Sequence, residues 1–350
     1  MKYRHVLLYA VRGLQSTSID NETVLVDETQ PAVRAALVRS PDLHTAIIDR
    51  GLAVVTLMLS AFTGRSRTGE VPEQIAAEIT DVQARTKKRL GTSAALVVRI
   101  EGAVKPDLTG VQREFDDYVT VFDAIDKDAI KAQDAIFVSS VVASLALAIG
   151  RSEPVEKLRD GIHLIDHAGK IYHSITPTAG SVSPMVSSLV SDTVLEATRT
   201  LVAAALGRSS LHGSLRLFVQ SLEPDNDRLR SFLAAWNSIE IFVNKTFADY
   251  EAALMAKIKE GGDSPGLDRY LSRIVEVMKP RYRLADKFAL LAHSLDSNAV
   301  ETDLQDFTEI KAIRDRLIHG EDIPDSELPL HKAQELLRRY LEIHLLSEGA

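Results

Sequence analysis

Two kinds of hydrophobic pattern share the first 160 residues of the chain. Short runs rich in β-branched and aliphatic residues predict strands, which lie at 5–10, 23–26, 94–100 and 118–122. Apolar residues that recur every three or four positions predict helices at 31–38, 43–62, 71–90 and 126–149. A proline at 154 favours a further short helix at 154–159. Because strands and helices do not alternate strictly, the pattern indicates an α+β region.

Residues 162–174 have the pattern of a β-hairpin. The sequence His-Ala-Gly at 167–169 suits a three-residue turn in which glycine takes the left-handed position. This register places His163 opposite His173 on neighbouring strands. Two histidines with no acid on the same face make a weak metal site, so a polar hairpin face is the favoured interpretation. A loop of small residues follows at 176–184.

The remainder of the chain has helical patterns. Ser191 and Asp192 precede an apolar helix that reaches residue 206, and a break at 207–213 contains two glycines. We place a domain boundary in this break, so that residues 1–210 form an α+β domain and residues 211–350 an all-α helical bundle. The bundle begins with a short apolar run, and its helices are predicted at 227–259, 267–278, 283–292, 310–318 and 330–346.

The composition is typical of a folded protein and excludes several kinds of catalytic and metal-binding site. Hydrophobic residues make up 45% of the 350 residues, which is enough for a core. The absence of cysteine excludes disulfides, thiolate catalysis and cysteine metal sites. No uninterrupted apolar stretch has the length of a membrane span and the N-terminus lacks a secretory signal. A cytoplasmic protein with no membrane partner is therefore expected.

Familiar ligand-binding motifs are also absent from the sequence. There is no phosphate loop, no Gly-x-Gly-x-x-Gly after a predicted strand, no paired histidines around a metalloprotease glutamate and no nucleophile elbow. The sequence Gly-Arg-Ser-Arg-Thr-Gly at 64–69 resembles a phosphate-binding turn, but without a suitably placed lysine an exposed turn is favoured. We expect no cofactor and no metal.

Residues able to do chemistry gather at the end of one predicted helix, which ends Arg-Asp-Arg-Leu-Ile-His-Gly at 314–320. Gly320 is a stop signal directly after the last periodic residues. An imidazole at such an exposed end suits acid–base catalysis. Arg314 and His319 lie roughly 140° apart around an ideal helix, so they converge only if the helix ends between them. Ordinary capping by Arg and His is the alternative.

The same residues resemble the motif of HEPN domains, which are small helical nucleotide-binding modules. The order Arg, polar residue, spacer, His-Gly is closest to the Apea-like branch, and the resemblance covers residues 220–345. Many HEPN domains are metal-independent endoribonucleases that work as homodimers. The resemblance therefore implies that Arg314 and His319 are the catalytic pair and that Asp315 orients them.

A second part of the resemblance lies on the long helix at 227–259. The sequence from Trp236 to Glu240 is similar to the aromatic and acidic positions of the first long HEPN helix. Some family members continue with Glu, three residues, Lys-Arg, whereas this chain has Asn244 and Lys245 at that spacing. Glu240 is therefore predicted to support the site and Lys245 to contact substrate.

The charge distribution limits any nucleic-acid surface to a small area. The net charge is −8, and residues 221–350 contain 17 lysines and arginines against 24 acids. A local basic patch remains at 279–283, for which a solvated helix start is the alternative interpretation. If RNA is the substrate, we expect a small electropositive cleft whose contacts include Lys245, Arg281, Arg283 and Arg316.

The resemblance implies an RNA-cleaving C-terminal domain, together with an N-terminal domain that holds it inactive until a regulatory partner or ligand arrives. The family resemblance implies a role as a toxin or antiviral-defence effector. One alternative is a non-catalytic HEPN-like scaffold for dimerisation or nucleotide binding. Another is an enzyme within residues 1–210, for which His163, Asp166 and His173 are the candidates.

Overall fold

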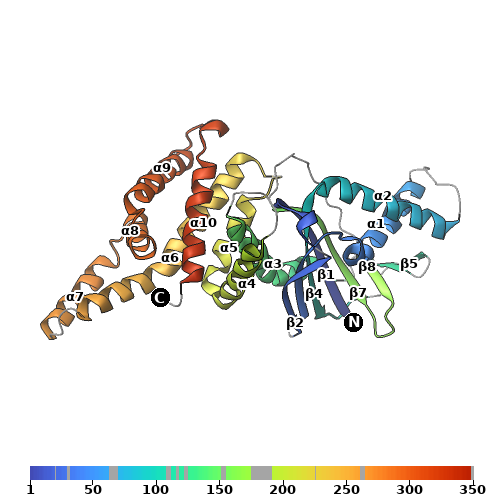
Figure 1. Ribbon diagram of the computed structural model, residues 1–350, viewed down its shortest axis with the longest axis horizontal. Coiled ribbons are helices and arrows are strands. Elements are labelled where there is room, and N and C mark those ends of the chain that lie inside the picture. The colour runs from blue at the N-terminus through green and yellow to red at the C-terminus, as the bar shows by residue number, and fades with distance from the viewer. Residues whose placement is uncertain are drawn as a thin grey trace. The chain divides into compact units, whose positions relative to one another are not determined.

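A computed structural model describes most of the chain (Figure 1). The described residues are 1–19, 21–29, 32–62, 70–107, 112–115, 118–121, 125–150, 155–174, 191–224, 226–260 and 265–347. They form two compact units. The N-terminal unit consists of Met1–Val141 and Glu153–Arg199, and the C-terminal unit consists of Val142–Ser152 and Thr200–Ala350.

The N-terminal unit is built on one mixed sheet with the strand order β2-β3-β4-β1-β7-β8-β6-β5. Neighbouring strands are antiparallel, except that β6 and β8 are parallel. The first strand thus lies in the middle of the sheet. The strands are β1 (Lys2–Gln15), β2 (Glu22–Thr29), β3 (Ala32–Val38), β4 (Ser93–Ala103), β5 (Gln112–Phe115), β6 (Tyr118–Val121), β7 (Val155–Ile165) and β8 (Ile171–Ser174).

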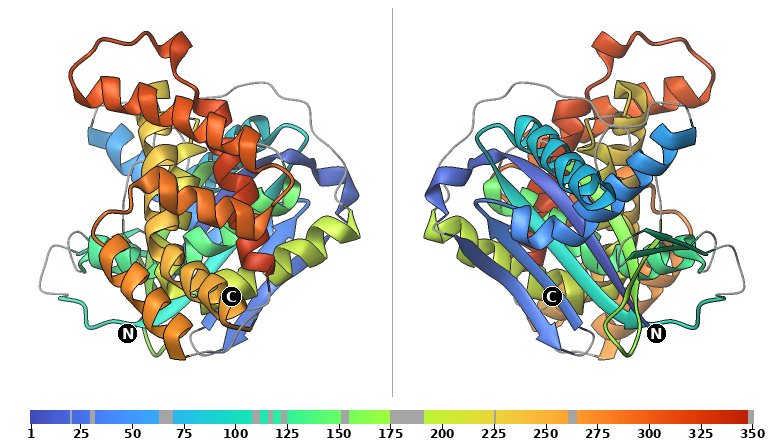
Figure 2. Two further views of the ribbon diagram at one scale, coloured as in Figure 1. Left: turned by 90° about the vertical axis from the view of Figure 1, so that its left-hand side faces the viewer. Right: turned by 90° about the vertical axis from the view of Figure 1, so that its right-hand side faces the viewer.

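Alternate residues of β1 face opposite sides of the sheet, and each side has its own core. Val6, Leu8 and Ala10 form one cluster with residues of helices α1 (Asp42–Phe62) and α2 (Val71–Leu90). Tyr3 belongs to a second cluster that includes Ile130 of α3 (Lys127–Ile149). Figure 2 shows α1 and α2, in blue to cyan, crossing one face of the sheet. This is the α+β architecture that the sequence predicted.

Two segments that were predicted as helices are strands. Residues 32–38 form β3, which pairs with β2 on one side and β4 on the other. Residues 155–159 belong to β7, which pairs with β1 and β8. Each segment is too short to form a stable helix by itself. Strand pairing satisfies its backbone groups instead, with β2 and β4 for residues 32–38 and with β1 for residues 155–159. The predicted helix start at 154 and the loops predicted at 64–69 and 176–184 lie outside the described residues.

The predicted hairpin is confirmed. His163 pairs with His173 in the register of β7 and β8, and Gly169 has a φ of 84°, in the left-handed region. The Asp166 carboxylate accepts hydrogen bonds from the backbone N–H groups of Ala168 and Lys170, each at 2.8 Å. Asp166 therefore stabilises the turn.

The C-terminal unit is mostly helical, as the sequence predicted. The long helix α6 begins after Asp227, whose carboxylate accepts a hydrogen bond from the backbone N–H of Arg230 at 2.7 Å. The α-helices of this unit are the ends of α3 and of α4 (Asp192–Gly207), followed by α5 (His212–Ser221), α6 (Arg228–Glu260), α7 (Pro265–Met278), α8 (Leu284–Leu295), α9 (Val300–Ile318) and α10 (Leu330–Leu346). Among these, α6 packs against α5, α8, α9 and α10.

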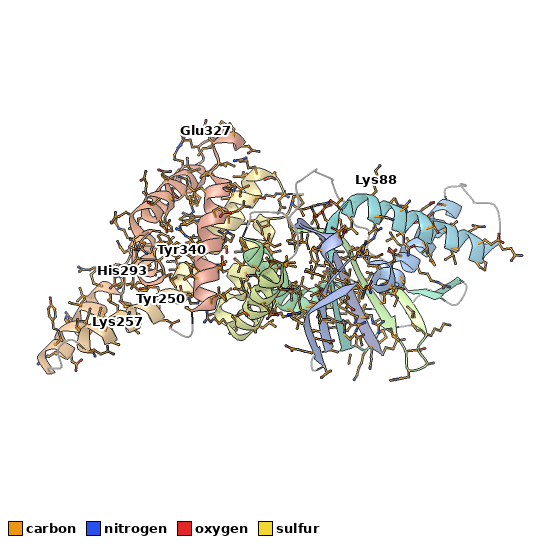
Figure 3. All side chains as sticks on the ribbon, in the orientation of Figure 1. Lys88, Tyr250, Lys257, His293, Glu327 and Tyr340 are labelled. Atoms are coloured by element: carbon orange, nitrogen blue, oxygen red, sulfur yellow. The ribbon has the colours of Figure 1, made fainter. Side chains whose placement is uncertain are left out.

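An aromatic core joins four of these helices. Phe307 of α9 stacks on Phe288 of α8, with 4.4 Å between ring centroids, and also contacts Trp236 of α6 at 5.5 Å. Tyr340 of α10, labelled in Figure 3, meets Phe288 edge to face. This packing fixes the position of α9 against α6, and these two helices carry the candidate site.

Helix α3 is the described helix that is long and apolar enough to cross a membrane, judged by length and composition alone. In its most apolar stretch, 61% of the residues are buried within the protein. A buried core helix of a globular protein meets the same criterion.

Candidate functional site

Helix α9 ends at Ile318 in a Schellman motif. The backbone N–H of Gly320 donates to the carbonyl of Leu317, and that of Glu321 donates to the carbonyl of Arg316, each at 3.0 Å. Gly320 has a φ of 82°, which favours glycine because it lacks a Cβ. The stop signal read from the sequence is therefore confirmed. It places His319 at the helix cap.

Substituting Gly320 with alanine is expected to lower the free energy of unfolding of the C-terminal unit by about 1 kcal/mol. A Cβ at this position meets no atom within 4 Å, so the effect comes from the left-handed backbone alone. Gly207→Ala is the matched control, because Gly207 has equal space and no such backbone conformation. Urea denaturation of both variants measures the difference. Equal stability of the two variants would contradict the prediction.

Arg314 lies between two carboxylates and an aromatic ring. Its Nη1 donates to Asp315 Oδ1 at 3.0 Å, and its Nη2 donates to Glu240 Oε2 at 3.4 Å. The guanidinium carbon lies 5.7 Å from the centroid of the Trp236 ring, within cation–π range. These contacts join α9 to α6 and hold the arginine in one orientation.

Glu240 and Trp236 reach the site together because they lie one helical turn apart on α6. The Trp236 indole Nε1 donates to Glu240 Oε2 at 3.2 Å, so this oxygen receives both the indole and Arg314. Trp236 is buried, whereas Glu240 is partly exposed. The structure therefore brings Trp236 and Glu240 of α6 together with Arg314 of α9.

Asp315 has two cationic neighbours. Lys311 of the preceding turn and Arg314 both bond its carboxylate. The hydrogen bond from Lys311 is the main reason that the pKa of Asp315 lies below its usual value, with Arg314 contributing in the same direction. Asp315 is therefore an anion that orients Arg314.

Arg316 faces away from this cluster and forms a bidentate pair with Glu321, with distances of 2.7 Å from Nε and 2.6 Å from Nη2. The pair spans the turn that ends α9, because Glu321 follows the Schellman glycine. A phosphate would have to compete with Glu321 for this guanidinium.

His319 is exposed, and the structure shows no hydrogen-bond partner for its imidazole among the described residues. Its backbone N–H donates to the carbonyl of Asp315 at 3.0 Å. The neighbouring Ile318 is 60% exposed, which is unusual for a large apolar residue. The imidazole is thus accessible to a substrate, beside an uncovered apolar side chain.

The remaining predicted substrate contacts are exposed and lie along α6 and the start of α8. Lys245 lines a surface hollow together with Glu240 and Asn244. Arg281 and Arg283 precede α8. In the described part of the chain, no hydrogen bond or ion pair joins these three cations to Arg314.

Sequence reasoning missed two contributors to the site. Lys311 bonds Asp315, and its four-residue spacing on the same helix face was the available signal. Glu321 holds Arg316 from beyond the glycine stop, and no regular spacing marks it.

The rival site in the N-terminal unit has less geometric support. Asp166 is used by the hairpin turn, while His163 is buried on β7. The described residues include no group of three or more histidine and acidic side chains that could hold a metal ion.

Comparisons of the chain with protein-family models, curated proteins and solved structures gave no match.

Proposed function

We propose that the C-terminal unit is a metal-independent endoribonuclease of the HEPN type. The observation that carries the proposal is the end of α9. Arg314 is held against Glu240 and Trp236 of α6, while the same helix ends by exposing His319. An oriented guanidinium and an accessible imidazole are the groups needed to cleave RNA without a metal.

The proposed reaction is transesterification within the RNA chain. The ribose 2′-oxygen forms a bond to the adjacent phosphorus while the bond from phosphorus to the 5′-oxygen breaks. One imidazole accepts the 2′-hydroxyl proton, and a protonated imidazole donates a proton to the departing 5′-oxygen. Arg314 stabilises the negative charge that builds on the phosphoryl oxygens. The products are a 2′,3′-cyclic phosphate and a 5′-hydroxyl.

Two proton-transfer groups favour a homodimeric site, because each protomer offers a single His319. Ile318, which is exposed beside it, suits contact with a second copy. A dimer also brings two copies of Arg314 to one phosphate. The second arginine strengthens phosphate binding, because in each protomer Glu240 and Asp315 already balance much of the positive charge of Arg314.

The biological role that fits this activity is a cytoplasmic toxin or antiviral-defence effector. The N-terminal unit would hold the nuclease inactive until a partner or ligand binds. A non-catalytic HEPN-like scaffold is the second candidate, and one observation favours it. Two of the five N–H donors of Arg314 already bond carboxylates, which leaves fewer donors and less net positive charge for a phosphate.

Substituting His319 with alanine is expected to lower the rate of RNA cleavage by about 100-fold or more, because the variant lacks its proton-transfer group. The test incubates purified full-length protein with total cellular RNA and a chelator, then analyses the new RNA ends. His293→Ala is the control, since His293 is also exposed in the C-terminal unit (Figure 3).

Chelator-resistant cleavage that leaves cyclic phosphates and is lost only in the His319 variant would support the nuclease. Cleavage at the same rate in both variants would overturn it. If the full-length protein is inactive, the isolated C-terminal segment distinguishes inhibition by the N-terminal unit from a scaffold role. RNA binding without cleavage by that segment would favour the scaffold.

A further inference from the structure

The N-terminal unit contains a cavity of about 520 Å³ between the sheet and helices α1 and α2. This volume is within the range of small-molecule sites. Its floor is formed by strands β1, β3 and β4, and its walls by residues of both helices. The cavity thus lies within one compact unit and on rigid elements, as ligand sites commonly do.

Four arginines line this cavity. Arg4, Arg34 and Arg99 come from β1, β3 and β4, while Arg50 comes from α1. Among the described lining residues, Glu22 is the single acid. Such a concentration of cations is unexpected in a chain whose net charge is −8. It favours an anionic ligand.

The strand register places two of these cations in direct opposition. Arg34 and Arg99 are cross-strand partners of the β3–β4 pair, and their side chains lie on the same face of the sheet. Like charges directly opposite each other destabilise a sheet. A local conflict of this kind is expected at functional sites, where a bound anion would relieve it.

The arginines differ in how many ion pairs they already form with acidic side chains of the protein. Arg34 bonds Glu22 at 2.9 Å and Asp27 at 2.6 Å. Arg4 bonds Glu101 at 2.9 Å. The Nε of Arg99 lies 3.8 Å from Glu101, and no bond to its terminal nitrogens is seen among the described residues.

The side chain of Arg99 is 45% exposed, so its planar fork of donors is accessible to a ligand.

The rest of the lining suits the organic part of a ligand. Ile47, Ile79 and Val97 provide apolar surface, and Gln83 and His44 provide polar groups that can fix an orientation. A bare inorganic anion would leave this apolar surface unused.

We propose that this cavity binds a small organic phosphate, with Arg99 and Arg4 holding the phosphate and the apolar wall contacting the organic body. Arginine matches the geometry of phosphate through paired N–H donors. The proposal is independent of any activity of the C-terminal unit, so either can fail while the other stands.

The test is calorimetric titration of the full-length protein with phenyl phosphate. This molecule combines a phosphate for the arginines with an apolar ring for the apolar wall. Saturable binding below about 1 mM is expected from a few charge-assisted hydrogen bonds. Inorganic phosphate should bind several-fold more weakly because it lacks an apolar part. Arg99→Ala should weaken phenyl phosphate at least tenfold. Lys88→Ala is the control. Lys88 is exposed on α2, does not line the cavity, and points away from the sheet (Figure 3).

A variant expected to bind more tightly is also needed, because misfolding could by itself explain a loss of binding. Glu22→Gln removes the acidic group from the lining and should strengthen phenyl phosphate binding several-fold. The proposal is overturned by an absence of saturable binding, by equal affinity for the two phosphates, or by equal losses in the Arg99 and Lys88 variants. It is also overturned if the Glu22 variant binds no more tightly than the wild type.

Discussion

Replacing His5 with phenylalanine is expected to lower the free energy of unfolding of the N-terminal unit by about 3–5 kcal/mol at pH 6. His5 is buried, with Nδ1 bonded to Asp134 at 2.7 Å and Nε2 bonded to Asp160 at 3.1 Å. Phenylalanine fills the space but leaves both carboxylates without their shared cation. Tyr3, at 3.1 Å from Asp134, compensates only in part.

The effect should depend on pH in a defined direction. Burial alone would lower the pKa of His5, but hydrogen bonds and charges from Asp134 and Asp160 outweigh burial and raise it. The fold therefore favours the charged imidazole. Its contribution is complete below the unfolded pKa, about 6.5, and is lost as the pH rises through the folded value.

Asp160 sets the lower limit of the same pH window. Burial raises its pKa, but the hydrogen bond from His5 and the charge of Lys131 outweigh burial and lower the pKa to about 2. Its contribution is present above the unfolded pKa, about 4, and is lost as the pH falls toward 2. The difference between wild type and His5→Phe should be largest between about pH 4 and 6.5.

The measurement is hydrogen exchange of the β1 backbone amides during urea unfolding, which reports on the N-terminal unit alone. Lys157→Ala is the control, because Lys157 lies 3.7 Å from Asp160 and is 40% exposed. Because Lys157 is partly exposed and Asp160 keeps its pair with Lys131, loss of this contact should cost at most about 1 kcal/mol. A His5→Phe protein as stable as the control would refute the prediction.

Removal of the Asp303 carboxylate is expected to destabilise the C-terminal unit by about 3 kcal/mol. Asp303 is buried on α9, accepts a hydrogen bond from the Tyr340 hydroxyl at 2.6 Å and forms an ion pair with Arg339. Asp303→Ala leaves the buried hydroxyl without an acceptor. Burial and the neighbouring carboxylate both raise the pKa of Tyr340, so this hydroxyl stays protonated and needs that acceptor.

Asp306→Ala provides the comparison for this prediction. Asp306 lies one turn further along α9 and pairs with Lys332 at 2.8 Å near the surface. Its removal deletes the same charge from the same helix but should change stability by less than about 1 kcal/mol. Hydrogen exchange of the α10 amides measures both variants, and losses of equal size would contradict the argument.

The sequence allowed the long elements to be predicted because each has a periodic face or a recognisable end. The helix now labelled α6 has an apolar stripe and an acidic cap at Asp227, and α9 ends at the predicted glycine. The strand β3 was predicted as a helix because apolar residues in this short segment recur at a spacing that also fits a helix. Only its pairing with β2 and β4, from distant parts of the chain, decides its structure.

Local sequence patterns and long-range contacts also contribute differently to the candidate sites. Arg314 and His319 were predicted as a pair from the resemblance to the HEPN motif, while the glycine stop placed His319 at a helix end. The bond from Arg314 to Glu240 joins residues 74 positions apart, and family resemblance rather than spacing suggested it. Three of the four cavity arginines come from three strands, and only the sheet register brings these three to one face. No pattern along the chain could indicate that site.

Trp236 is the single tryptophan of the protein, and it contacts both Glu240 and Arg314. The candidate site therefore contains an intrinsic fluorophore. Its emission should respond when a bound anion draws Arg314 away from the indole ring, so occupancy of the site can be followed without a label. The N-terminal unit contains no tryptophan, so excitation at wavelengths that tyrosine does not absorb yields a signal from Trp236 of α6, beside Arg314 of α9.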